Sequence, residues 1–111
     1  MIDRVASFLQ GLAPTWPDVA PLDQIRRHGA VLTYRVAGSR AIARTLDGEL
    51  LAMNIEVTAL SFDRSIGQAL ADRVVERMRA SPWAASRTDL RNSYDAEAKL
   101  WSASRTLALA P

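Results

Sequence analysis

The chain has 111 residues, of which 49% are hydrophobic and 23% charged, with a formal net charge of +2. This length is typical of one domain, so we expect a single α+β domain over residues 1–111. The chain contains no cysteine, which excludes disulfide scaffolds and cysteine-dependent active sites. Of its 14 basic residues, 13 are arginine, which we interpret as the coding bias of a GC-rich bacterial or phage genome.

Two helices are predicted in the first quarter of the chain. In residues 2–13 apolar side chains recur every three or four positions, and Pro14 ends the pattern because proline cannot continue a helical hydrogen-bond ladder. A shorter helix is predicted over residues 21–28, since Pro21 suits a first turn and Gly29 suits a left-handed cap.

The middle of the chain predicts three antiparallel strands. Asp47-Gly48 favours a tight hairpin turn, and Gly38-Ser39 indicates a second one. The expected strands are residues 30–37, 40–46 and 49–59.

One face of this predicted sheet combines an apolar stripe with two arginines. Its members are Arg35, Arg44, Leu51, Met53, Ile55 and Val57. A small antiparallel sheet usually has one polar face, and neither face is polar here. Either the register is shifted by one residue, or both faces are covered by a second helix layer or by a partner chain.

Two further helices are expected after the strands. Residues 63–80 carry an apolar stripe at helical spacing, and Ser65 and Gln68 have the spacing of a capping box. Residues 94–108 also show apolar side chains at helical spacing. The predicted order is therefore α-α-β-β-β-α-α, a three-stranded antiparallel meander packed against an N-terminal helix and two C-terminal helices.

No arrangement of residues points to catalysis. His28 is the only histidine, and it lies at a predicted helix end without a nucleophile motif elsewhere in the sequence. With no cysteine and no calcium-loop pattern, a metal site is not expected. Glycine-rich phosphate loops are also missing from the sequence. We therefore expect a protein that is not an enzyme and that uses no cofactor.

Protein binding is the function that the sequence favours. Apolar residues mixed with arginine and tryptophan are typical of interface centres. The residues expected to contact a partner are Arg35, Arg44, Leu51, Met53, Ile55 and Trp83. The partner would be another protein or a second copy of this chain. Such a module suits a small bacterial or phage accessory or inhibitor protein, for example an anti-CRISPR-like blocker of host machinery.

The alternative is a nucleic-acid-binding protein that grips phosphates through surface arginines. The residues in question are Arg35, Arg44, Arg64, Arg73 and Arg77. A net charge of only +2 and the lack of a polybasic cluster make this the weaker hypothesis.

The N-terminus is a poor secretory signal because Asp3 occupies a position where positive charge is required. No stretch approaches the ~18 consecutive apolar residues that a membrane-spanning helix needs. We expect a cytoplasmic protein that does not contact a membrane.

Overall fold

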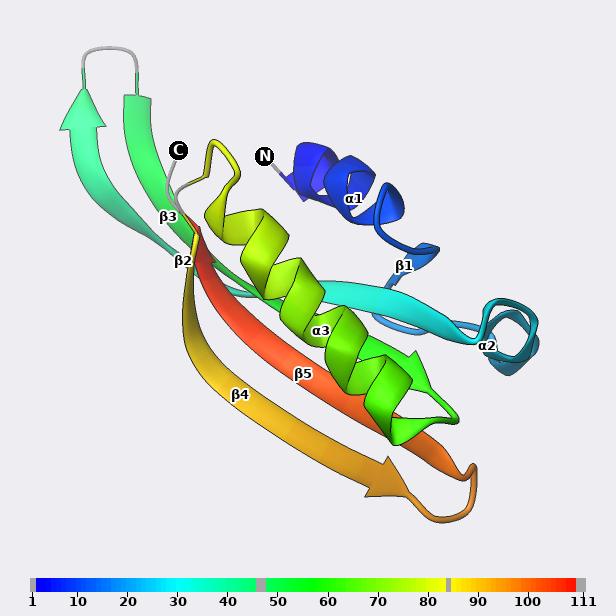
Figure 1. The fold of residues 1–111 in the computed structure, drawn as a ribbon. Coiled ribbons are helices and arrows are strands. Elements are labelled where there is room, and N and C mark those ends of the chain that lie inside the picture. The colour runs from blue at the N-terminus through cyan, green and yellow to red at the C-terminus, as the bar shows by residue number, and fades with distance from the viewer. Residues whose placement is uncertain (1, 46–47, 84, 110–111) are drawn as a thin grey trace.

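In the computed structural model, the described parts of the chain are residues 2–45, 48–83 and 85–109, and they form three helices and five strands (Figure 1). For residues 2, 39–45 and 48–52 only the backbone is described. The elements in order are α1 (Ile2–Gln10), β1 (Thr15–Pro17), α2 (Leu22–His28), β2 (Ala30–Thr45), β3 (Gly48–Ser61), α3 (Arg64–Arg79), β4 (Ser86–Asp95) and β5 (Leu100–Leu109).

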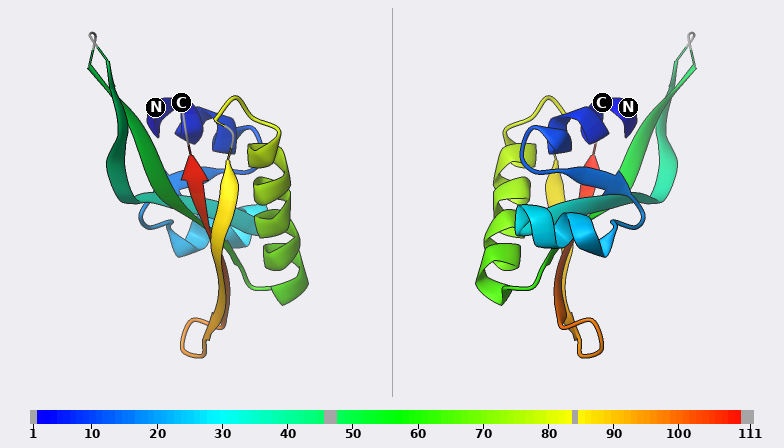
Figure 2. Two further views of the ribbon diagram at one scale, coloured as in Figure 1. Left: turned by 90° about the vertical axis from the view of Figure 1, so that its left-hand side faces the viewer. Right: turned by 90° about the vertical axis from the view of Figure 1, so that its right-hand side faces the viewer.

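The five strands form one mixed sheet in the order β1-β2-β3-β5-β4. β1 runs parallel to β2, and the other neighbouring pairs are antiparallel. Helices α1 and α3 pack on one face of the sheet, while α2 lies against the other face at one end (Figures 1 and 2).

The main core lies between the sheet and the two helices α1 and α3. On β3 every second residue points into it, and Ile55 and Val57 are almost completely buried. Its other buried members are Val5, Leu9, Leu32, Ala59, Ala71, Val74, Val75, Met78, Ala85, Ala103, Leu107 and Leu109. A smaller cluster around Ile25 and Val31 fixes α2 to the opposite face. The sheet is therefore covered on both faces near α2 but only on one face elsewhere.

The predicted three-stranded meander is wrong. Residues 30–45 form one continuous strand, β2, which passes through Gly38 and Ser39 without turning. The register with β3 shifts between Val36 and Gly38 and again between Ala41 and Ala43. A β-bulge absorbs an extra residue in a continuing strand, so a glycine in the strand pattern marked a bulge rather than a hairpin.

The predicted C-terminal helix over residues 94–108 is also wrong, because this segment belongs to the β4–β5 hairpin. Trp101, Ala103, Leu107 and Leu109 alternate along β5 on the face that packs against α3. Arg105 interrupts that apolar alternation. The observed order is α-β-α-β-β-α-β-β, with a five-stranded mixed sheet.

The helices α1, α2 and α3 confirm the first three helix predictions. Gly29 ends α2 with a φ of 81°, in the region that favours glycine. Helix α3 is capped by Asp63 rather than by the expected Ser65, because the Asp63 side chain accepts hydrogen bonds from the backbone N–H groups of Ser65 and Ile66. The hydrogen bonds that Asp63 accepts hold the pKa of its carboxyl below the usual value, and the bond from the Ser65 side chain contributes most to this shift.

The expected Asp47-Gly48 turn falls partly outside the described residues, since residues 46 and 47 are not described. The strands on either side pair Thr45 with Gly48. From Gly48 to Ala52, β3 pairs with β2 alone, since its pairing with β5 begins at Met53. This part of the β2–β3 hairpin projects beyond the rest of the sheet (Figure 1).

In the described part of the chain, every helix is too short or too polar to cross a lipid bilayer.

Candidate functional site

The two edges of the sheet differ in how their backbone groups are satisfied. At the β1 edge, the Gln10 side chain reaches from the end of α1 to the backbone of Thr15. Gln10 Nε2 donates to the Thr15 carbonyl at 2.7 Å, and the Thr15 N–H donates to Gln10 Oε1 at 3.2 Å. One side-chain amide thus replaces a neighbouring strand. Pro17 ends this short strand and has no N–H to offer.

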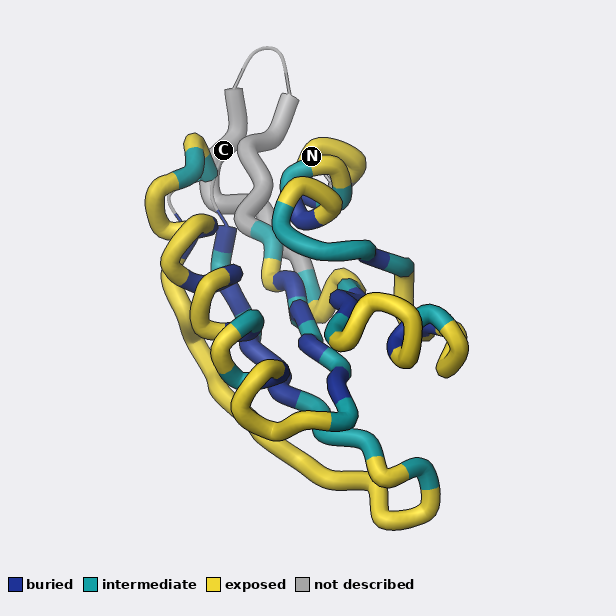
Figure 3. The backbone as a smooth tube through the Cα atoms, turned by 45° about the vertical axis from the view of Figure 1, so that its right-hand side comes forward, coloured by how far each residue is buried: buried dark blue, intermediate teal, exposed yellow. Residues whose placement is uncertain are grey.

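The other edge, β4, is exposed along its length. All ten of its residues are exposed, although the neighbouring strand β5 is largely buried (Figure 3). Seen from its own side, β4 lies in front of the rest of the sheet, and no described element covers its outer side (Figure 2, left). An uncovered edge strand offers its backbone groups as a template for another strand.

The hydrogen bond of Leu90 shows which backbone groups of β4 face outward. Its N–H donates to Asp89 Oδ1 at 2.8 Å, so it does not pair with β5. Because inward and outward residues alternate in an antiparallel edge strand, the N–H and C=O groups of Asn92 and Tyr94 also face outward. Among the described residues, no side chain accepts from the N–H of Asn92 or Tyr94. The outward groups near the β4–β5 turn are therefore available to a partner.

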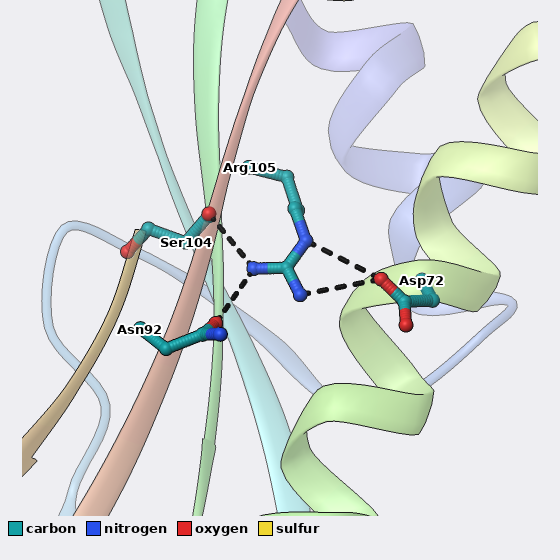
Figure 4. Close-up of polar contacts among 4 residues, drawn as sticks. All are labelled: Asp72, Asn92, Ser104 and Arg105. Carbon is teal, nitrogen blue, oxygen red and sulfur yellow. Dashed lines mark hydrogen bonds and ion pairs between the residues drawn. The ribbon is translucent and has the colours of Figure 1, made fainter. Parts of the chain in front are cut away.

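A buried arginine fixes β4 against α3 and β5 (Figure 4). Arg105 on β5 is only 2% exposed, and its guanidinium donates to Asp72 Oδ1 on α3 at 3.2 and 3.4 Å. The same group donates to Asn92 Oδ1 on β4 at 2.9 Å and to the Ser104 carbonyl at 3.0 Å. Because each nitrogen of the buried guanidinium has a hydrogen-bond partner, Arg105 supports the sheet.

The two faces of β4 carry different side chains. Leu90 and Tyr94 lie on the side towards α3 and are 43% and 47% exposed. The centroid of the Tyr94 ring is 4.5 Å from the centroid of the Trp101 ring. Towards the opposite face lie Arg91, Ser93 and Asp95, which line a shared cleft. The edge therefore has an apolar side and a charged side.

The cleft has a volume of about 470 Å³ and lies on the sheet face that only α2 covers. Its floor is rich in hydroxyl groups, two of which, Thr58 Oγ1 and Ser104 Oγ, are 2.8 Å apart. Its charges are mixed: Asp18, Glu56 and Asp95 are balanced in part by Arg91. The lining of the cleft therefore mixes apolar side chains with charges of both signs and is not strongly cationic.

Of the residues predicted to bind a partner, those whose side chains are described do not share one surface. Ile55 is fully buried in the core, and Met53 is half-buried. Trp83 packs edge-on against Phe8, with 5.6 Å between the ring centroids, and contacts the core. Arg35 lies on the opposite face of the sheet and forms an ion pair with Glu56 at 3.1 Å. The side chains of Arg44 and Leu51 lie outside the described part of the structure.

The arginines of the nucleic-acid hypothesis are also dispersed. Arg35 is separated by the sheet from Arg64, Arg73 and Arg77, which belong to α3. The Arg64 guanidinium lies over the Trp101 ring at 5.3 Å from its centroid. Arg73 and Arg77 are exposed on the helix surface. The described arginines of this set do not form a continuous phosphate-binding surface.

No family model matches the chain, and no curated protein matches it in sequence.

Sequence reasoning missed the β4 edge because no strand was predicted over residues 86–95, and the helix expected over residues 94–108 overlaps its end. A signal was present, since charged and polar residues at positions 89, 91, 93 and 95 alternate with Leu90, Asn92 and Tyr94. This period of two is typical of a strand with two distinct faces.

Proposed function

We propose that the protein is a non-catalytic protein-binding module that takes up an extended segment of a partner along the β4 edge. The observation that carries this proposal is that all ten residues of the edge strand β4 are exposed, with outward backbone groups at Asn92 and Tyr94. Strand addition to such an edge obtains affinity from main-chain hydrogen bonds and specificity from the alternating side chains.

The side chains of β4 support this mode of binding. Leu90 and Tyr94 offer apolar contact area beside α3, and an exposed aromatic ring is a frequent anchor at interfaces. Arg91 and Asp95 on the other side favour a partner segment with complementary charges. The rigid attachment of β4 through Arg105 keeps the edge in place before a partner arrives.

In this proposal the protein is a small accessory or inhibitor protein of bacterial or phage type that acts in the cytoplasm. A chain without cysteine is compatible with a reducing compartment. Its near-neutral charge balance argues against mimicry of nucleic acid, so an inhibitor of this kind would cover a protein surface instead.

The proposal is tested by affinity capture from native lysate with tagged wild-type protein, Tyr94→Pro and Tyr94→Ala, each with and without nuclease. Both variants lose the tyrosine ring, but only proline removes the outward N–H of residue 94. We expect a stoichiometric protein band that survives nuclease, falls roughly tenfold with Tyr94→Pro and is better retained with Tyr94→Ala. Circular dichroism on both variants controls for folding.

Two results would overturn the proposal. Equal capture by wild-type protein and a folded Tyr94→Pro variant would show that the β4 edge is not the contact surface. Loss of all bands on nuclease treatment would favour the nucleic-acid alternative. In that case, labelled DNA or RNA should bind with an affinity that falls steeply between about 50 and 200 mM salt.

A further inference from the structure

The charges on the cleft side of β4 have a self-complementary order. Arg91, Ser93 and Asp95 follow one another at every second position and line the same cleft. Ser93 lies midway between a positive and a negative side chain. When such a strand is placed antiparallel to its own copy about the midpoint, each charge faces its opposite.

We propose that the partner of the β4 edge is a second copy of this chain, paired antiparallel through β4 with the twofold axis at Ser93. This inference rests on the proposed function, because it names the occupant of the same edge. Arg91 of each copy lies opposite Asp95 of the other, which makes two reciprocal ion pairs. In each copy, the outward backbone groups of Asn92 form hydrogen bonds with those of Tyr94 in the other copy.

Two registers that lie closer to the start of β4 are less favourable for identifiable reasons. Centring the pair on Asn92 places Asp89 opposite Asp95, and centring it on Arg91 places two arginines opposite each other. Like charges directly opposite on paired strands are destabilising. These two registers are therefore disfavoured by charge alone.

Centring on Leu90 would bring Asp89 opposite Arg91, which is also attractive. However, the Leu90 N–H would then have to leave Asp89 Oδ1, and the pairing would run into the register shift between Arg87 and Asp89. A bulge interrupts a regular ladder. The Ser93 register avoids both costs, since its central pairs use the regular part of β4 after the bulge.

The dimer joins the two sheets edge to edge and brings the clefts of the two copies together. Because Arg91, Ser93 and Asp95 border the cleft of their own copy, the two clefts meet at the twofold axis. On the other face, Tyr94 of each copy lies beside Asn92 of its neighbour. An edge that is open in the single chain is thereby closed in the pair.

A cysteine at the twofold axis tests the register directly, because the natural chain contains no cysteine. In the proposed dimer the two Ser93 residues form a non-hydrogen-bonded pair with Cα atoms about 4.5 Å apart, within the range that a disulfide spans. With a mild oxidant, we expect Ser93→Cys to convert most of the 12.2 kDa chain into a species of twice that mass on non-reducing gels.

The matched control is Ser86→Cys, an exposed serine on the same strand. In the Ser93 register its two copies lie at opposite ends of the interface, too far apart for a disulfide. We expect this variant to remain monomeric on the gel. Equal cross-linking of both variants, or none with Ser93→Cys, would overturn the proposed register.

A charge exchange gives an independent test by analytical ultracentrifugation. Arg91→Asp alone faces Asp95 of its copy, and Asp95→Arg alone faces Arg91, so each variant should lose dimerisation. Mixing the two variants restores opposite charges in both pairs, and we expect the dimer to return. Asp95 also accepts hydrogen bonds from the N–H groups of Glu97 and Ala98, so thermal unfolding must show that the variant is folded.

The outcomes separate this inference from the proposed function. If wild-type protein sediments as a monomer over a concentration series while Tyr94-dependent capture of a different protein persists, the second copy is overturned and the binding module stands. If the dimer forms and Tyr94→Pro abolishes it, both are supported. If neither self-association nor Tyr94-dependent capture occurs, both are overturned.

Discussion

The two edges of the sheet differ in whether their outward backbone groups have hydrogen-bond partners. At β1 a strand of three residues ends in proline, and Gln10 supplies both a donor and an acceptor to Thr15. At β4 a strand of ten residues is exposed throughout. A single side-chain amide is therefore enough to satisfy the outward backbone groups of a short edge strand. An edge that is left without such a closure is therefore a candidate binding surface.

Within β4 the protection is confined to one half. The register shift between Arg87 and Asp89 and the hydrogen bond from Leu90 N–H to Asp89 both lie near its beginning. The half that contains Asn92 and Tyr94 has neither feature. The open half is also the half that carries the Arg91 and Asp95 charges, so backbone availability and charge order coincide.

The largest effect on the open edge is expected from Arg105→Met. Methionine fills similar space but removes the donors that Arg105 supplies to Asn92 Oδ1 and to the Ser104 carbonyl. We expect a loss of about 2 to 3 kcal/mol in the free energy of unfolding, measured with urea, and faster hydrogen exchange along β4. Arg73→Met on the exposed surface of α3 is the control. Unchanged exchange on β4 would show that Arg105 does not fix this edge.

A smaller loss is expected when the closed edge is opened by Gln10→Ala. The Thr15 N–H and C=O then lose their partners in a half-buried environment. We expect a decrease of about 1 to 2 kcal/mol in the free energy of unfolding. Gln24→Ala, at a partly exposed position on α2, should change stability by less than about 0.5 kcal/mol. If both variants behave alike, the Gln10 amide does not close the β1 edge.

Asp89→Ala should extend the open part of β4 with little effect on stability. The Leu90 N–H loses its acceptor at 2.8 Å, and its hydrogen exchange should accelerate. Because both residues are exposed, the free energy of unfolding should change by no more than about 0.5 kcal/mol. Exchange at the β5 amides provides the internal reference. Unaltered exchange at Leu90 would show that Asp89 does not protect this edge.

The smallest expected effect on stability comes from Asp63 at the start of α3, away from both edges of the sheet. Hydrogen bonding lowers the pKa of Asp63 below its ordinary value of 3.8, so its ionised form stabilises the folded state. This contribution is present above pH 4 and is lost as pH falls through the folded-state pKa. Asp63→Asn should remove that part of the pH dependence of the melting temperature while keeping a capping side chain. An unchanged pH profile would contradict this assignment.

The functional surface could be predicted only in part. Three of the four helices predicted from the sequence are present, and the α+β class is correct, because capping residues, prolines and apolar spacing act locally. It misassigned residues 94–108, where alanine, leucine and serine spacing is compatible with either a helix or a strand. The apolar stripe that suggested an interface includes Ile55, which belongs to the core once α1 and α3 cover the sheet.

By itself, the sequence determined where α1, α2 and α3 lie along the chain, the lack of cysteine chemistry and the modest net charge. These properties depend on residue type and on neighbours along the chain. Only the tertiary structure decided that β5 lies between β3 and β4, that Gln10 closes one edge and that Arg105 is buried beneath α3. Strand pairing joins residues that are distant in sequence, so no local pattern could show which edge would be left open.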